Sequence, residues 1–140
     1  MKITSKLLIE IAQELDAGMK VFINKDTLEI KPILDWDDIM DNEPWEKEME
    51  EIDRTWPNFA VITKMETWEA FKVMEEFIDE VEDEQFREGL IKILNRKSPF
   101  ANFKAEVESS SYRQNWFDFK QMKYEEYASV KLNDEGFNIE

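Results

Sequence analysis

The chain has 140 residues, of which 33 are aspartate or glutamate and 18 are lysine or arginine, so its net charge is −15. It contains neither histidine nor cysteine, which excludes the commonest general base, a thiolate nucleophile, disulfides, and metal sites built from these ligands. The negative charge opposes binding to nucleic acid and anionic membranes, and no segment approaches the roughly 18 apolar residues of a membrane span. The length favours a single domain over residues 1–140, and the absence of cysteine favours a cytoplasmic location.

The first part of the chain predicts one helix and a small sheet. Residues 5–17 have the apolar spacing of a helix that packs on one face. In residues 21–31, two short apolar runs flank a polar turn, which is the pattern of a β-hairpin. Residues 59–62 predict a third strand that pairs with it.

An acidic insert, residues 35–56, separates the hairpin from the third strand. Its residues 35–53 contain ten acidic side chains and a single cation, Lys47. We expect a loop over 35–43 and then a short amphipathic helix, because apolar residues recur with helical period after Pro44.

The acidic insert holds two sets of candidate binding residues. Trp36, Trp45 and Trp56 are surrounded by charge, which is typical of a protein-binding surface and equally of residues that cover a sheet. Four aspartates also lie close together here: Asp35, Asp37, Asp38 and Asp41. They lack the ligand order and glycine of an EF-hand, so we expect weak binding of divalent cations and no dedicated metal site.

The rest of the chain predicts four helices, over residues 65–81, 83–94, 98–107 and 112–132. Their inward faces are expected to include these apolar side chains: Trp68, Phe71, Ile78, Phe86, Leu90, Phe100, Phe103, Trp116, Phe119 and Val130. Exposed rings could stack on bases, but burial is favoured, because each buried ring stabilises the fold by about 1.5–3 kcal/mol.

Five segments of the chain form a recognisable series: residues 11–20 (IAQELDAGMK), 71–78 (FKVMEEFI), 86–90 (FREGL), 95–104 (NRKSPFANFK) and 116–119 (WFDF). In this order they resemble an uncharacterised bacterial family, UPF0158, and residues 11–20 resemble the family's opening. The resemblance covers most of the chain. It implies a shared fold and no particular reaction, because the family has no established activity.

Residues 87–104 form a basic segment with a net charge of +4 in an otherwise acidic chain. The candidate anion-binding residues within it are Arg87, Arg96, Lys97 and Lys104. Two of them precede a predicted helix N-terminus, whose unpaired amides also attract anions. The competing interpretation is that these cations pair with surplus acids on the surface.

Four carboxylates, Glu75, Glu76, Asp79 and Glu82, share part of one predicted helix. Paired carboxylates serve as acid and base in hydrolases, but solvated helix faces have the same composition. Glu75 has the phase of the apolar residues around it, which would turn it toward the core. No catalytic constellation is visible, and no cofactor is expected.

The sequence therefore predicts an α+β fold, with a small antiparallel sheet (a hairpin plus one strand) and a helical C-terminal half. The function expected is a non-enzymatic interaction or regulatory module that binds a protein partner or an anionic ligand. The alternative is a nucleic-acid-associated factor that uses residues 87–104. The sequence indicates no membrane association and leaves the oligomeric state open.

Overall fold

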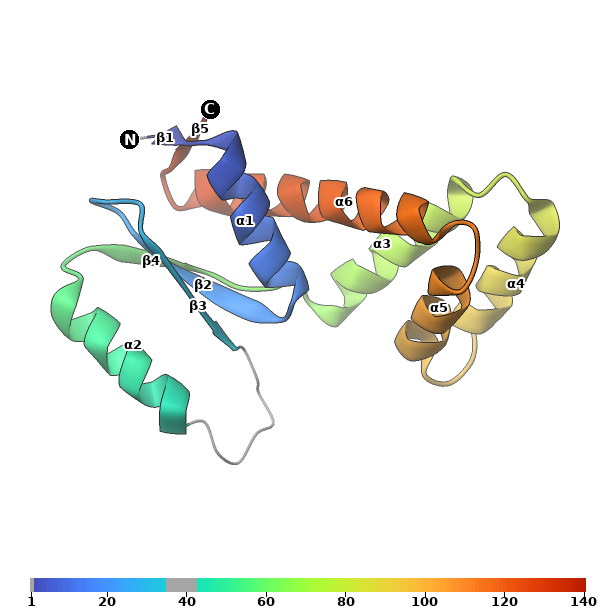
Figure 1. Cartoon of the computed structure of the whole chain (residues 1–140), viewed down its shortest axis with the longest axis horizontal. Coiled ribbons are helices and arrows are strands. Elements are labelled where there is room, and N and C mark those ends of the chain that lie inside the picture. Colours follow the sequence, from blue (N-terminus) through green and yellow to red (C-terminus); the bar gives the residue numbers. More distant parts are fainter. Residues whose placement is uncertain (1, 35–42) are drawn as a thin grey trace. The chain divides into compact units, whose positions relative to one another are not determined.

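The computed structural model describes residues 2–34 and 43–140, and the chain divides into two compact units (Figure 1). The sheet unit comprises Met1–Lys64 with Tyr124–Glu140, and the helical unit comprises Met65–Lys123. A small antiparallel sheet and a helical C-terminal half are both present, so the predicted α+β class is confirmed. The single domain that the length favours stays a prediction.

The sheet has the strand order β3–β2–β4. Strand β2 (Met19–Asn24) pairs antiparallel with both β3 (Ile30–Leu34) and β4 (Phe59–Ile62), as the hairpin and third strand predicted. The turn after β2 is held by the side chain of Asn24, whose oxygen accepts hydrogen bonds from the amides two and three residues later (2.8 and 3.2 Å). This Asx turn explains why the polar residues between the strands form a tight connection.

Helices α1 (Ser5–Asp16) and α2 (Glu43–Thr55) lie on opposite sides of the sheet (Figure 1). Helix α1 begins where the Thr4 hydroxyl accepts a hydrogen bond from a first-turn amide (3.1 Å), and its buried residues are Ile11, Ala12 and Leu15. Ile52 of α2 and the following Trp56 form a buried cluster with two sheet residues, Phe22 and Ile33. The acidic insert thus contributes to the core of the sheet unit.

The first and last strands of the chain pair with each other. Strand β1 (Lys2–Ile3) pairs in parallel with β5 (Asn138–Ile139), and the amide of Glu140 donates to the carbonyl of Ile3 (2.9 Å). Phe137, just before β5, is buried. This pairing was not predicted, because strands of two residues are too short to show a periodicity.

The helical unit contains α3 (Thr67–Asp79), α4 (Glu84–Leu94), α5 (Pro99–Glu108) and the first part of α6 (Arg113–Asp134), which continues into the sheet unit. These are the four helices that the sequence predicts. Within residues 2–34 and 43–140, no helix has both the length and the apolar character needed to cross a membrane.

The core of the helical unit is built around three aromatic rings. Phe77 of α3, Phe103 of α5 and Trp116 of α6 are all buried, and their ring centroids lie 5.1–6.4 Å apart. Their edge-to-face arrangement is the favourable geometry for such rings. The predicted burial of Phe103 and Trp116 is confirmed, and Phe119 beside them is half-buried.

Four side chains expected to face inward do not. Trp68 is 64 % exposed, Val130 is 58 % exposed and Phe100 is 38 % exposed. Trp68 stands nine residues before the buried Phe77, and at 3.6 residues per turn this separation places it about half a turn away from the core face. Glu75 is also exposed, so the expectation that it turns toward the core is wrong.

Candidate functional site

The helical unit carries an open apolar groove of about 920 Å³, here called the aromatic groove. Its apolar lining comes from Trp68 and Phe71 of α3 and from Pro99 and Phe100 of α5. It lies beside the N-terminal ends of both helices. Exposed apolar side chains usually occur singly, so a set that lines one groove is informative.

The N-terminus of α3 holds Trp68 at the surface. Glu66 is the N-cap residue, and it forms a reciprocal capping box with Glu69. The second carboxylate oxygen of Glu66 accepts a hydrogen bond from the Trp68 indole Nε1 (2.7 Å). This hydrogen bond orients the indole at the N-terminal end of α3, where most of the ring is exposed to solvent.

The opposite wall of the groove is set by the start of α5. Ser98 has a left-handed backbone (φ 52°, ψ 52°), and Pro99 occupies the first helical position. The Phe100 ring then meets the Phe71 ring edge to face, with centroids 6.3 Å apart. Two helices that are separate in sequence therefore share one aromatic surface.

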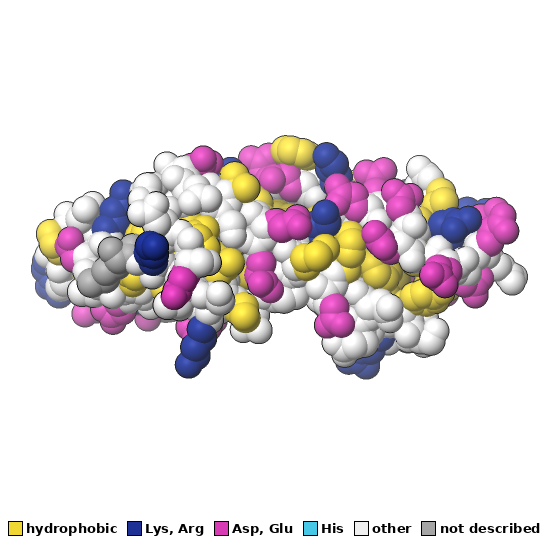
Figure 2. Space-filling model, turned by 90° about the horizontal axis from the view of Figure 1, so that it is seen from above, with side chains coloured by type: hydrophobic (Ala, Val, Ile, Leu, Met, Phe, Trp, Pro, Cys, Tyr) yellow, Lys and Arg dark blue, Asp and Glu magenta, His cyan; other side chains and the backbone are white. Residues whose placement is uncertain are grey.

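The charged side chains that line the aromatic groove are two acids and one base, namely Glu66, Glu75 and Lys72. Acidic side chains are spread over the face of the molecule that Figure 2 shows, and hydrophobic atoms reach the surface between them. The two carboxylates and the aromatic walls of the groove favour a ligand that carries positive charge next to apolar groups.

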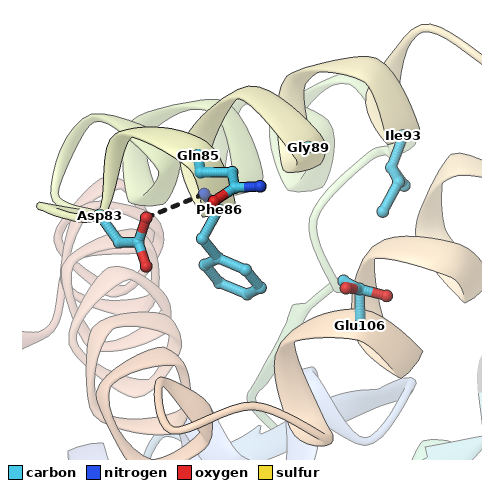
Figure 3. Close-up of a pocket in the computed structure, with 6 residues that line it drawn as sticks. All are labelled: Asp83, Gln85, Phe86, Gly89, Ile93 and Glu106. Atoms are coloured by element: carbon cyan, nitrogen blue, oxygen red, sulfur yellow. Dashed lines mark hydrogen bonds between the residues drawn. The ribbon is translucent and has the colours of Figure 1, made fainter.

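A second cavity, of about 420 Å³, lies in the same unit (Figure 3). We call it the Phe86 pocket. It is lined by residues of α4 and its cap and by one residue of α5: Asp83, Gln85, Phe86, Gly89, Ile93 and Glu106. In Figure 3 the Phe86 ring projects from α4 into the space that Glu106 enters from α5. The lining combines an aromatic ring, an aliphatic side chain and two carboxylates.

The Phe86 ring is positioned by the N-terminal cap of α4 and by a second aromatic ring. Asp83 caps α4, since its Oδ1 accepts a hydrogen bond from the Phe86 amide (3.1 Å). The Phe86 ring stacks on Tyr112, with centroids 5.2 Å apart and planes inclined by 8°. The Tyr112 hydroxyl oxygen accepts from the Asp83 amide (3.3 Å), which links the cap and the stack.

The structure does not bring the four candidate anion-binding residues into one site. Arg87 donates through Nη1 to the carbonyl of Val81 (3.0 Å), so it closes the end of α3. Arg96 and Lys97 are exposed in the turn between α4 and α5. Nine residues of mostly helical chain separate Arg87 from Arg96, an axial distance of about 13 Å. Lys104 is exposed on α5.

Of the three candidate tryptophans, the structure describes the side chain of Trp56. Trp36 and the ring of Trp45 lie outside the described residues. Trp56 is 7 % exposed and packs with Phe22 and Ile33, while the ammonium of Lys31 lies 5.7 Å from its ring. Of the two interpretations left open for this set, Trp56 fits the one in which it covers the sheet.

The carboxylates weighed for metal binding or catalysis do not form a described site. The four aspartates of residues 35–41 lie outside the described residues. Elsewhere, in the part of the chain that the structure describes, no three carboxylates are grouped so as to hold a metal ion. Glu76 of α3 forms an ion pair with Lys123 of α6 (2.8 Å).

The sequence holds at most a partial signal for each cavity. The phase of Trp68 places it on the exposed side of α3 only once Phe77 is known to be buried. Gly89, in the interior of α4, interrupts a helical pattern without ending it, at a cost of about 1 kcal/mol relative to alanine. The stacking of Phe86 on Tyr112 depends on the fold and left no sequence signal.

The comparisons with known proteins give one finding. The model of an uncharacterised protein family, UPF0158, matches residues 2–139, which is nearly the whole chain. Neither the curated proteins nor the solved structures give a match.

Proposed function

We propose that this chain, which belongs to the UPF0158 family, is a non-enzymatic interaction module that binds a protein partner through the aromatic groove. The observation that carries the proposal is the exposed indole of Trp68, held in place by Glu66 beside two phenylalanine rings. Tryptophan is the residue type most enriched at the energetic centre of protein interfaces. A cytoplasmic location in a bacterial cell belongs to the same proposal and is supported by the cysteine-free composition.

The partner segment that we propose is short, amphipathic and basic. The groove volume of about 920 Å³ accommodates a few side chains, and its walls are mainly aromatic. Two carboxylates against one ammonium among the charged lining residues, together with the net charge of −15, favour lysine or arginine beside the apolar anchors. An acidic segment would meet the repulsion of the whole chain.

The test is a titration with two matched peptides, each capped at both ends. One has leucine and phenylalanine on one helical face with flanking lysines, and the other has glutamates in place of the lysines. The basic peptide should shift the Trp68 indole NMR signal saturably, and Trp68→Ala should weaken binding on the order of tenfold or more. Val130→Ala truncates another well-exposed apolar side chain, which lies in the sheet unit, and serves as the control.

Equal binding of both peptides, or equal affinities of the Trp68→Ala and Val130→Ala variants, would contradict the proposal. Equal binding of both peptides would show that charge does not determine the choice of partner. Equal affinities of the two variants would show that the aromatic groove is not the binding surface. Trp68 is mostly exposed, so its replacement is not expected to unfold the unit.

The alternative, a nucleic-acid-associated factor that uses residues 87–104, has less support. Its cations are dispersed, and Arg87 is engaged by a backbone carbonyl. The few phosphates that Arg96 and Lys97 could neutralise give little affinity against a net charge of −15. The double variant Arg96→Ala with Lys97→Ala, tested against an oligonucleotide or a phosphate-bearing ligand at low salt, should leave binding unchanged; a loss of binding would favour this alternative.

A further inference from the structure

The Phe86 pocket has a shape that a glycine keeps open. Gly89 lies inside α4 without the left-handed backbone found at the two other glycines of the chain. A Cβ added there would meet nothing within 4 Å, so close packing does not require glycine either. Glycine in a helix interior is less stable than alanine by about 0.5–1 kcal/mol. What glycine does provide at this position is an unobstructed wall of the pocket.

The pocket also presents an aromatic face that is already oriented. Tyr112 covers one side of the Phe86 ring in a parallel stack, and the same ring is among the residues that line the pocket. The Asp83 cap fixes the start of α4, from which Phe86 projects. Little side-chain freedom is then lost when a flat group stacks on the ring, which favours binding.

The charged residues that line the pocket favour a positively charged ligand. Its ionisable lining residues are Asp83 and Glu106, and none of the described residues that line it is a lysine or arginine. An anion would be repelled, and a purely apolar ligand would remove water from two carboxylates without replacing their hydrogen bonds. A cation with several N–H donors satisfies both requirements.

We infer that the Phe86 pocket binds a guanidinium group carried on an alkyl chain. The planar cation stacks on Phe86, its N–H groups donate to the carboxylates of Glu106 and Asp83, and its alkyl stem packs against Ile93. Guanidinium is the cation that combines aromatic stacking with paired donors to a carboxylate. This site is distinct in its lining from the aromatic groove and does not depend on the function proposed for that groove.

The inference is tested with a charged probe and its neutral isostere. N-acetyl-arginine amide is titrated into the full chain while the amide signal of Gly89 is followed by NMR, and N-acetyl-citrulline amide is the matched control. Citrulline has the shape of arginine without its charge. The arginine probe should give saturable shifts, and the citrulline probe should bind at least about tenfold more weakly, since charge-assisted hydrogen bonds are lost.

Four variants locate the binding. Glu106→Gln should weaken the arginine probe severalfold, whereas Glu88→Gln, which neutralises an exposed acid of α4 that does not line the pocket, should leave the affinity unchanged. Gly89→Leu should abolish binding by filling the space. Trp68→Ala should have no effect, which separates a failure here from a failure of the proposed function.

Equal binding of the arginine and citrulline probes, or equal affinities of the Glu106→Gln and Glu88→Gln variants, would overturn the inference even if Gly89→Leu did not fold. A further titration with N-acetyl-agmatine, whose single charge matches that of the capped arginine, distinguishes the source of the guanidinium. Tighter binding of N-acetyl-agmatine than of the capped arginine indicates a free small molecule, and the reverse order indicates an arginine side chain of a polypeptide; both support the pocket chemistry.

Discussion

Trp56 in the sheet unit is 7 % exposed, whereas Trp68 in the helical unit is 64 % exposed, although each stands among acidic residues. Trp56 follows Ile52 by one helical turn, so both side chains reach the same face of the sheet. Trp68 lies on the side of α3 opposite to the buried Phe77, and its indole donates a hydrogen bond to Glu66 at the end of the helix. The comparison teaches that phase along the helix, more than residue type or local charge, decides which aromatic residues remain available for binding.

The two units also differ in charge. The helical unit has 13 acidic and nine basic residues, a net charge of −4, whereas the remaining residues carry −11. The acidic excess is therefore concentrated where Trp56 is buried, and the aromatic groove lies in the more nearly neutral unit. An interface there should rely mainly on apolar contact, with charge setting the choice of partner.

The largest effect is expected from replacing the buried tryptophan. Trp56→Ala should lower the free energy of unfolding by about 3–5 kcal/mol, because it opens a cavity against Phe22 and Ile33. Trp68→Ala should change it by less than about 1 kcal/mol, since most of its ring is already in water. Urea denaturation followed by circular dichroism measures both. Similar losses in the two variants would show that the contrast in burial is wrong.

The same contrast can be sharpened within one helix. Phe100 and Phe103 stand three residues apart on α5, one partly exposed in the groove and the other fully buried against Phe77 and Trp116. Phe103→Ala should destabilise the chain by about 3–5 kcal/mol, and Phe100→Ala by about 1 kcal/mol. Only the second variant should stay folded well enough to test peptide binding. If Phe100→Ala proves the more damaging, the groove is part of the core.

The fold was largely predictable because its signals are local. Two short apolar runs around a polar turn identified β2 and β3, and Thr4 identified the start of α1. The surfaces were less predictable, since α3 offers two apolar stripes and the sequence does not say which one is buried. The stripe with Phe77 is buried because Phe103 and Trp116 are brought to it by other helices. Contacts of this kind are set by tertiary structure.

The smallest effect compares two glycines, one from each unit. Gly89→Ala should raise the free energy of unfolding by about 0.5–1 kcal/mol, because alanine favours the helix and its Cβ meets open space. Gly136→Ala should lower it by about 1 kcal/mol, because Gly136 follows α6 with a left-handed backbone (φ +92°).

Both variants can be compared with the unchanged chain in one series of urea titrations, and the opposite signs are the diagnostic result. Gly136→Ala is the matched control, because both changes add the same methyl group and neither new Cβ meets an atom within 4 Å. Only backbone conformation then distinguishes them. A loss of stability in Gly89→Ala would mean that other atoms already occupy the space next to Gly89. The space assigned to the guanidinium would then not exist.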